Sequence, residues 1–157
     1  MRKTIIFTLL GFVIGLAVGF IITVAFFGPK MAQAMFMLQE AEICEMEDAA
    51  VQAYHNQPNE VAIWALENYI KTLNKLKEQR SSADVENPYL ILSPAQSLVL
   101  THARLGQLYK KMGHVEKSKH NLEQAMSNIE NAGLKVIKTE EDLIAFINRL
   151  DEKIKQE

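Results

Sequence analysis

The stretch HARLGQLYKKMGHVEKSKHNLEQAM, residues 102–126, decides the fold that we expect for the C-terminal half of this 157-residue chain. Its apolar side chains recur every three or four residues on both sides of Gly113, which is the period of an amphipathic helix. A glycine between two such segments marks a turn. The stretch therefore predicts two helices, one ending near Met112 and one running from Val115 to Asn131.

Polar residues around this helix pair mark further helix ends. In SPAQ, residues 93–96, serine can cap a helix, proline suits its first position and glutamine can bond back to the serine. Gly133 is expected to end the second helix in the left-handed conformation. Thr139, followed by EED at 140–142, predicts a last helix whose negative first turn suits the helix dipole. The residues expected to pack that helix on the pair are Leu143, Phe146, Ile147, Leu150 and Ile154.

The segment between residues 30 and 80 also predicts helices. Gly28-Pro29 is expected to end or kink any helix before it, and proline then suits the start of a new helix over 30–54. Asn59, in the turn HNQPN, is expected to cap the next helix, with Trp64 and Tyr69 on its core side. Residues 80–94 predict a loop with a short extended piece at 89–92. The fold class that we expect is all-α.

The N-terminus carries an apolar run that is long enough to cross a membrane. Residues 4–27 contain no charged side chain, and a helix of that length would span about 36 Å against a hydrocarbon core of about 30 Å. Arg2 and Lys3 precede the run, so residues 1–3 are expected to stay in the cytoplasm while the rest of the chain is exported, to the periplasm or outside of a bacterial cell. Residues 4–27 are thus predicted to be a single-pass signal-anchor helix in the lipid bilayer.

Two features of this N-terminal region leave alternatives open. Ala32-Gln33-Ala34 fits a signal-peptide cleavage site, which would release a soluble helical domain, although the apolar run is longer than most signal sequences. Gly11, Gly15 and Gly19 share one face of the predicted span, where small residues let another membrane helix approach closely. Helix–helix association in the membrane is therefore an open possibility.

Residues 98–130 resemble one tetratricopeptide repeat, a 34-residue antiparallel helix pair. The matching residues are Leu105, Gly106, Tyr109, Gly113, Ser118, Leu122 and Ala125. The resemblance implies that residues 30–157 form a small domain of such helical hairpins, closed by the last helix as a cap. It also implies a groove lined by the first helix of the pair, with Ala103, Gln107, Lys110 and Lys111 facing a partner that carries an acidic peptide or a carboxylate.

Chemical motifs are missing from the sequence. It has no glycine-rich phosphate loop, no nucleophile elbow and no H-E-x-x-H, and its single cysteine, Cys44, excludes an internal disulfide. His102, His114 and His120 do not fall on adjacent turns of one helix, as a metal site in one helix needs. Basic residues in the 102–126 stretch lack interleaved aromatics, so nucleic-acid binding is not expected. We expect no catalytic residues, no cofactor and no metal.

Two functional hypotheses follow from this sequence. The first is a scaffold module, anchored in the membrane and related in form to tetratricopeptide proteins, that recruits a partner protein at the membrane surface. The second is a structural or assembly subunit of a membrane complex, held through the glycine stripe of its membrane helix.

Overall fold

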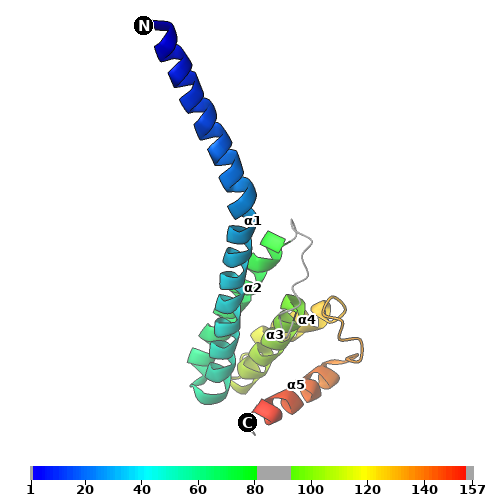
Figure 1. Cartoon of the computed structure of the whole chain (residues 1–157). Coiled ribbons are helices and arrows are strands. Elements are labelled where there is room, and N and C mark those ends of the chain that lie inside the picture. Colours follow the sequence, from blue (N-terminus) through cyan, green and yellow to red (C-terminus); the bar gives the residue numbers. More distant parts are fainter. Residues whose placement is uncertain (1, 81–92, 155–157) are drawn as a thin grey trace. The chain divides into compact units, whose positions relative to one another are not determined.

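The computed structural model describes residues 2–80 and 93–154, and within these ranges all regular structure is helical (Figure 1). The elements are α1 (Arg2–Asn56), α2 (Asn59–Arg80), α3 (Pro94–Lys111), α4 (Val115–Asn128) and α5 (Glu140–Ile154). The all-α prediction is therefore confirmed for this part of the chain, as is a long apolar helix at its N-terminus. The extended piece expected at 89–92 lies outside the described residues.

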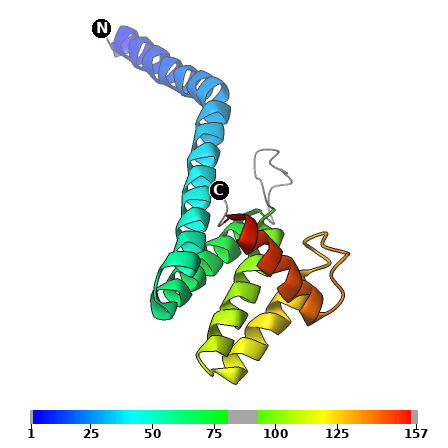
Figure 2. The same ribbon diagram turned by 90° about the horizontal axis from the view of Figure 1, so that it is seen from below.

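The chain divides into two compact units, Met1–Glu42 and Ile43–Glu157. In the first unit Gly28-Pro29 does not end the helix, because α1 continues through both residues, so the separate helix predicted over 30–54 is wrong. A kink at Gly28-Pro29 was the other predicted outcome. Proline removes one hydrogen bond of the helix ladder, which a long helix tolerates by bending, and the ribbon of α1 bends within its blue part (Figure 2). Ala32-Gln33-Ala34 consequently lies inside a helix.

Near the N-terminus, the part of α1 over Val18–Asn56 is long and apolar enough to cross a membrane, by length and composition alone. Large apolar side chains lie exposed along α1, among them Leu16, Phe20, Ile21, Phe26 and Phe27. A signal sequence near an N-terminus has the same properties. Met35 and Leu38, further along the same unit, are also exposed.

The second unit has two hydrophobic clusters, and α3 contributes to both. One cluster joins the last turns of α1 with α2 and α3, through residues such as Ala50, Leu66 and Leu105. The other joins α3 with α4, α5 and the segment between them, through residues such as Ala103 and Leu143. The central position of α3 explains why eleven of its residues are buried.

Exposure separates correct from incorrect core predictions. Tyr69 is buried at 2% exposure, as expected, whereas Trp64 is 67% exposed, so its expected place in the core is wrong. In α5, Leu143 and Ile147 are fully buried while Ile154 is 41% exposed and lies outside the packed stripe. Trp64 lies two residues from buried Leu66 and so projects from the opposite side of α2, whereas Ile154 is the last residue of α5.

The helix ends follow local hydrogen bonds. The Ser93 hydroxyl accepts a bond from the Gln96 amide, and the Gln96 side chain accepts one from the Ser93 amide, which is the predicted capping box. Thr139 and Asp142 form the corresponding reciprocal cap of α5. The capping prediction for Asn59 is wrong, because the carbonyl of Pro58 accepts the first helical bond and makes Asn59 the first helical residue.

The turns on either side of α4 both use glycine. Gly113 has a φ of 77° at the predicted turn between α3 and α4. Gly133 is left-handed too, with a φ of 69°, but α4 ends at Asn128, earlier than the predicted Asn131. Backbone bonds within residues 128–134, such as Leu134 N–H to the Ile129 carbonyl, form a turn after the helix instead.

The tightest crossing in the second unit is between α3 and α4 at Gly106. A Cβ built on Gly106 would lie 2.6 Å from Cγ of Leu122 and 3.3 Å from the Ser118 carbonyl oxygen. The Ser118 hydroxyl donates a 2.8 Å hydrogen bond to the Gly106 carbonyl across the same crossing. Glycine is therefore required here for close approach, and the buried serine takes part in that contact.

We predict that Gly106→Ala destabilises the domain by about 1–3 kcal/mol, because the added methyl overpacks the crossing. Denaturant unfolding of the full chain in detergent, followed by circular dichroism, measures the change. In a Leu122→Ala background, which removes the clashing atoms, the same substitution should have a much smaller effect. Equal effects in the two backgrounds would contradict the steric explanation.

Candidate functional site

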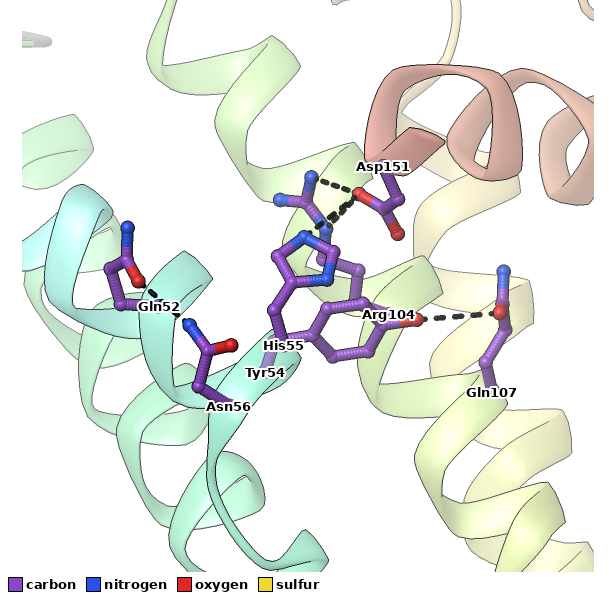
Figure 3. Close-up of polar contacts among 7 residues, drawn as sticks. All are labelled: Gln52, Tyr54, His55, Asn56, Arg104, Gln107 and Asp151. Carbon is purple, nitrogen blue, oxygen red and sulfur yellow. Dashed lines mark hydrogen bonds and ion pairs between the residues drawn. The ribbon is translucent and has the colours of Figure 1, made fainter. Parts of the chain in front are cut away.

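A buried ion pair connects α3 with α5 at the centre of the second unit. Arg104 donates to Oδ1 of Asp151 from Nε at 3.2 Å and from Nη2 at 2.7 Å (Figure 3). Arg104 is 4% exposed and Asp151 is 7% exposed. A charge so deeply buried needs a partner, since water cannot solvate it.

The last turn of α1 reaches the same carboxylate. Nε2 of His55 lies 3.6 Å from Oδ1 of Asp151, and the Arg104 guanidinium lies 5.6 Å from the centre of the Tyr54 ring. The Tyr54 hydroxyl donates to Oε1 of Gln107 at 3.4 Å. Burial, with a smaller contribution from the Asp151 charge, raises the pKa of Tyr54 to about 12, so the hydroxyl stays protonated as a donor.

Gln107 has a buried donor that is not used within this cluster. Its Nε2 is buried and makes no hydrogen bond to any residue in the described ranges. Leaving a buried amide N–H unpaired costs about 1–3 kcal/mol. An oxygen supplied from outside the cluster would remove that penalty.

Gln107 belongs to a line of side chains that we call the inner row of α3, comprising Leu100, Ala103, Arg104, Gln107, Lys110 and Lys111. These residues share one side of the helix by their spacing. Lys110 and Lys111 are exposed, as a partner-binding role requires, and Gln107 is half-buried. Ala103, however, is 0% exposed within the second hydrophobic cluster, so it cannot contact a ligand in this structure.

Neighbouring residues fix the end of α3 that carries the two lysines. The Tyr109 hydroxyl donates a 2.7 Å bond to Oε1 of Glu67 on α2, and burial raises the pKa of Tyr109 to about 12. Nζ of Lys117 on α4 lies 5.1 Å from the centre of the Tyr109 ring. The end of α3 is thereby held to both adjacent helices.

The three histidines of the 102–126 stretch do not converge. His102 is half-buried and its Nδ1 lies 3.0 Å from Oδ1 of Asn121, whereas His114 and His120 are exposed. Burial lowers the pKa of His102. Within residues 2–80 and 93–154, no group of three histidine, cysteine or acidic side chains could hold a metal ion.

The glycine stripe belongs to the first unit. At Gly15 and Gly19 an added Cβ would meet nothing within 4 Å, so among the described residues nothing packs against these two positions. The side-chain environment of Gly11 lies outside the described residues.

Sequence patterns alone did not identify His55, Arg104 and Asp151 as one cluster. His55 was expected to be a turn residue, but it lies in the last turn of α1. A signal was present in α5, where Asp151 follows Leu143 and Ile147 at four-residue spacing in an otherwise apolar stripe. An acidic residue in such a stripe predicts a buried counter-charge.

Comparison of the chain with protein-family models, curated proteins and solved structures found no match. The tetratricopeptide resemblance therefore stays a prediction carried by the seven matching residues of the 98–130 segment.

We predict that Asp151→Asn destabilises the domain by about 3–5 kcal/mol, because it leaves the Arg104 charge buried without a counter-charge. Unfolding of the full chain in detergent measures this loss, and Glu152→Gln, at the exposed neighbouring position, is the matched control. The double variant Arg104→Met/Asp151→Leu should recover most of the stability. A double variant as unstable as Asp151→Asn would contradict this account.

We predict a histidine-dependent loss of stability in mild acid. Because folding lowers the pKa of His102, the unfolded chain takes up a proton first as the pH falls below about 6.5. The His102 contribution is therefore complete above that pH and is lost toward the lower pKa of the folded state. The free energy of unfolding should therefore fall less between pH 7.5 and 5.5 in His102→Gln than in the wild type, as measured by denaturant unfolding at each pH.

Proposed function

We propose that this protein is a membrane-anchored, tetratricopeptide-like binding module that holds a partner protein at the membrane surface. Residues 4–27 would anchor it, with the N-terminus in the cytoplasm and the helical domain exported. The partner would bind at the open end of the inner row, where Gln107, Lys110 and Lys111 follow one another on α3. An acidic peptide or a carboxylate fits this end.

The observation that carries the proposal is the unpaired buried donor of Gln107 beside two exposed lysines. A carboxylate or carbonyl oxygen there would satisfy the Gln107 amide, and the lysines would favour negative charge on the same ligand. The Tyr54 hydroxyl donates to Oε1 of the same amide, and this bond orients the Gln107 side chain before a partner binds. The cluster has no activated nucleophile, so binding is the role that its chemistry supports.

We predict that a photo-crosslinking amino acid at position 111 of the full chain captures a defined partner in intact membranes. Adding Lys110→Glu should reduce that capture about tenfold, because a like charge opposes an acidic ligand. The same probe at exposed Lys75 on α2, with Lys77→Glu, is the matched control. Capture of the same partner at positions 75 and 111, or insensitivity to Lys110→Glu, would remove the open end of α3 as the binding site.

The open glycine stripe supports a second candidate, a structural subunit that joins a membrane complex through α1. At Gly15 and Gly19 there is room for another helix to approach. Under this alternative Gly15→Leu should release the protein from its complex during native electrophoresis while the domain stays folded. Retention of the complex by Gly15→Leu, together with its loss in Lys110→Glu/Lys111→Glu, would favour the binding module.

Cleavage near Ala34 would leave a secreted domain instead of an anchored one. The intact mass of the protein recovered from the native host separates these cases, because the anchored form keeps residues 1–34. We expect the full-length mass in the membrane fraction.

A further inference from the structure

α5 lies on the same side of α3 that carries the inner row. Arg104 of α3 and His55 of α1 both approach Asp151 of α5, so this helix bridges the two earlier ones (Figure 3). Leu143 and Ile147, both fully buried, belong to the same hydrophobic cluster as Leu100 and Ala103. Leu143, Ile147 and Asp151 are four residues apart and form one stripe of α5.

The inner row is consequently divided into a covered half and an open half. Leu100, Ala103 and Arg104 are at most 5% exposed. Gln107 is half-buried, and Lys110 and Lys111 are exposed. The covered half already holds a helix of defined chemistry, with two aliphatic side chains and a carboxylate.

We propose that α5 occupies the covered half of the inner row in the free protein, and that an amphipathic helix of a partner protein displaces α5 from it. The partner helix would carry aliphatic residues at positions i and i+4 and an acidic residue at i+8, as α5 does. Its carboxylate would take over the bond to Arg104, so the buried cation never loses its counter-charge. The inference rests on the proposed function, since it assumes that the inner row binds protein, and it assigns the chemistry of the partner.

The packing of α5 allows it to leave as a unit. It is the last described helix, and only Leu143, Ile147 and Asp151 among its fifteen residues are buried. The contact between α3 and α4 at Gly106, Ser118 and Leu122 does not involve α5. A helix with so few buried residues belongs to the part of a protein that opens first.

The test uses a fluorescent synthetic peptide of residues 138–157 as the competing helix, added to the full chain in detergent. In Leu143→Ala/Ile147→Ala the chain's own α5 is weakened, so the peptide should bind with a Kd about tenfold lower than for the wild type. A peptide that carries Asp151→Lys should not bind, because it places a like charge against Arg104. Equal Kd values for the two chains, or equal binding of the two peptides, would overturn the proposal.

Hydrogen exchange on the wild-type chain gives a second measurement that needs no variant to fold. Amides of α5 should exchange together and faster than those of α3 and α4. If the amides of α5 exchanged only when the whole domain unfolds, the proposal would be overturned. Photo-crosslinking at position 111 tests the open end of α3, whereas peptide binding and hydrogen exchange test helix displacement, so failure of one proposal can be told from failure of the other.

Discussion

The ion pair between Arg104 and Asp151 fixes the arrangement of the second unit. Two charges at this depth lose several kcal/mol of hydration each, and only direct contact between them offsets that loss. The bond geometry therefore admits few positions of α5 on α3. Apolar contacts of Leu143 and Ile147 attract α5 to its neighbours, but such contacts are not directional. The apolar stripe of α5 would therefore allow several alignments of the helix, and the ion pair selects one of them.

The same pair determines which surface is left for function. Because α5 is held at Arg104, the half of the inner row before Gln107 is covered, and the half after it is open. Tyr54 and His55 approach from α1, so the boundary between the two halves involves three helices. Nε2 of Gln107, which makes no hydrogen bond to the described residues, lies at this boundary, between the ion pair and the exposed lysines along α3.

Helix ends and close contacts could be predicted from the sequence because they depend on neighbouring residues. The capping box of Ser93 and Gln96, the turn at Gly113 and the start of α5 at Thr139 each need only a few side chains with known local preferences. Burial was less predictable. Trp64 is exposed although Ala62 and Leu66 are buried, because a residue two positions from each of them projects from the opposite side of α2. Ile154 follows the spacing of the buried stripe of α5 and is exposed because it lies at the end of the helix.

The place of α5 could not be predicted, because it depends on contacts that are far apart in the sequence. A capping helix suggested by the repeat resemblance explains the apolar stripe of α5 but does not say which face it covers. That face is set by Arg104 and Asp151, which are 47 residues apart. The position of Asp151 in the apolar stripe of α5 predicts a buried counter-charge but does not say which helix carries it. Ala103 shows the consequence, since the resemblance assigns it to an open groove and the ion pair one residue later holds a helix over it. A residue that repeat spacing assigns to a groove is therefore available to a partner only if no other part of the chain packs over it. Here a charged residue next to the assigned position holds another helix of the same chain over it.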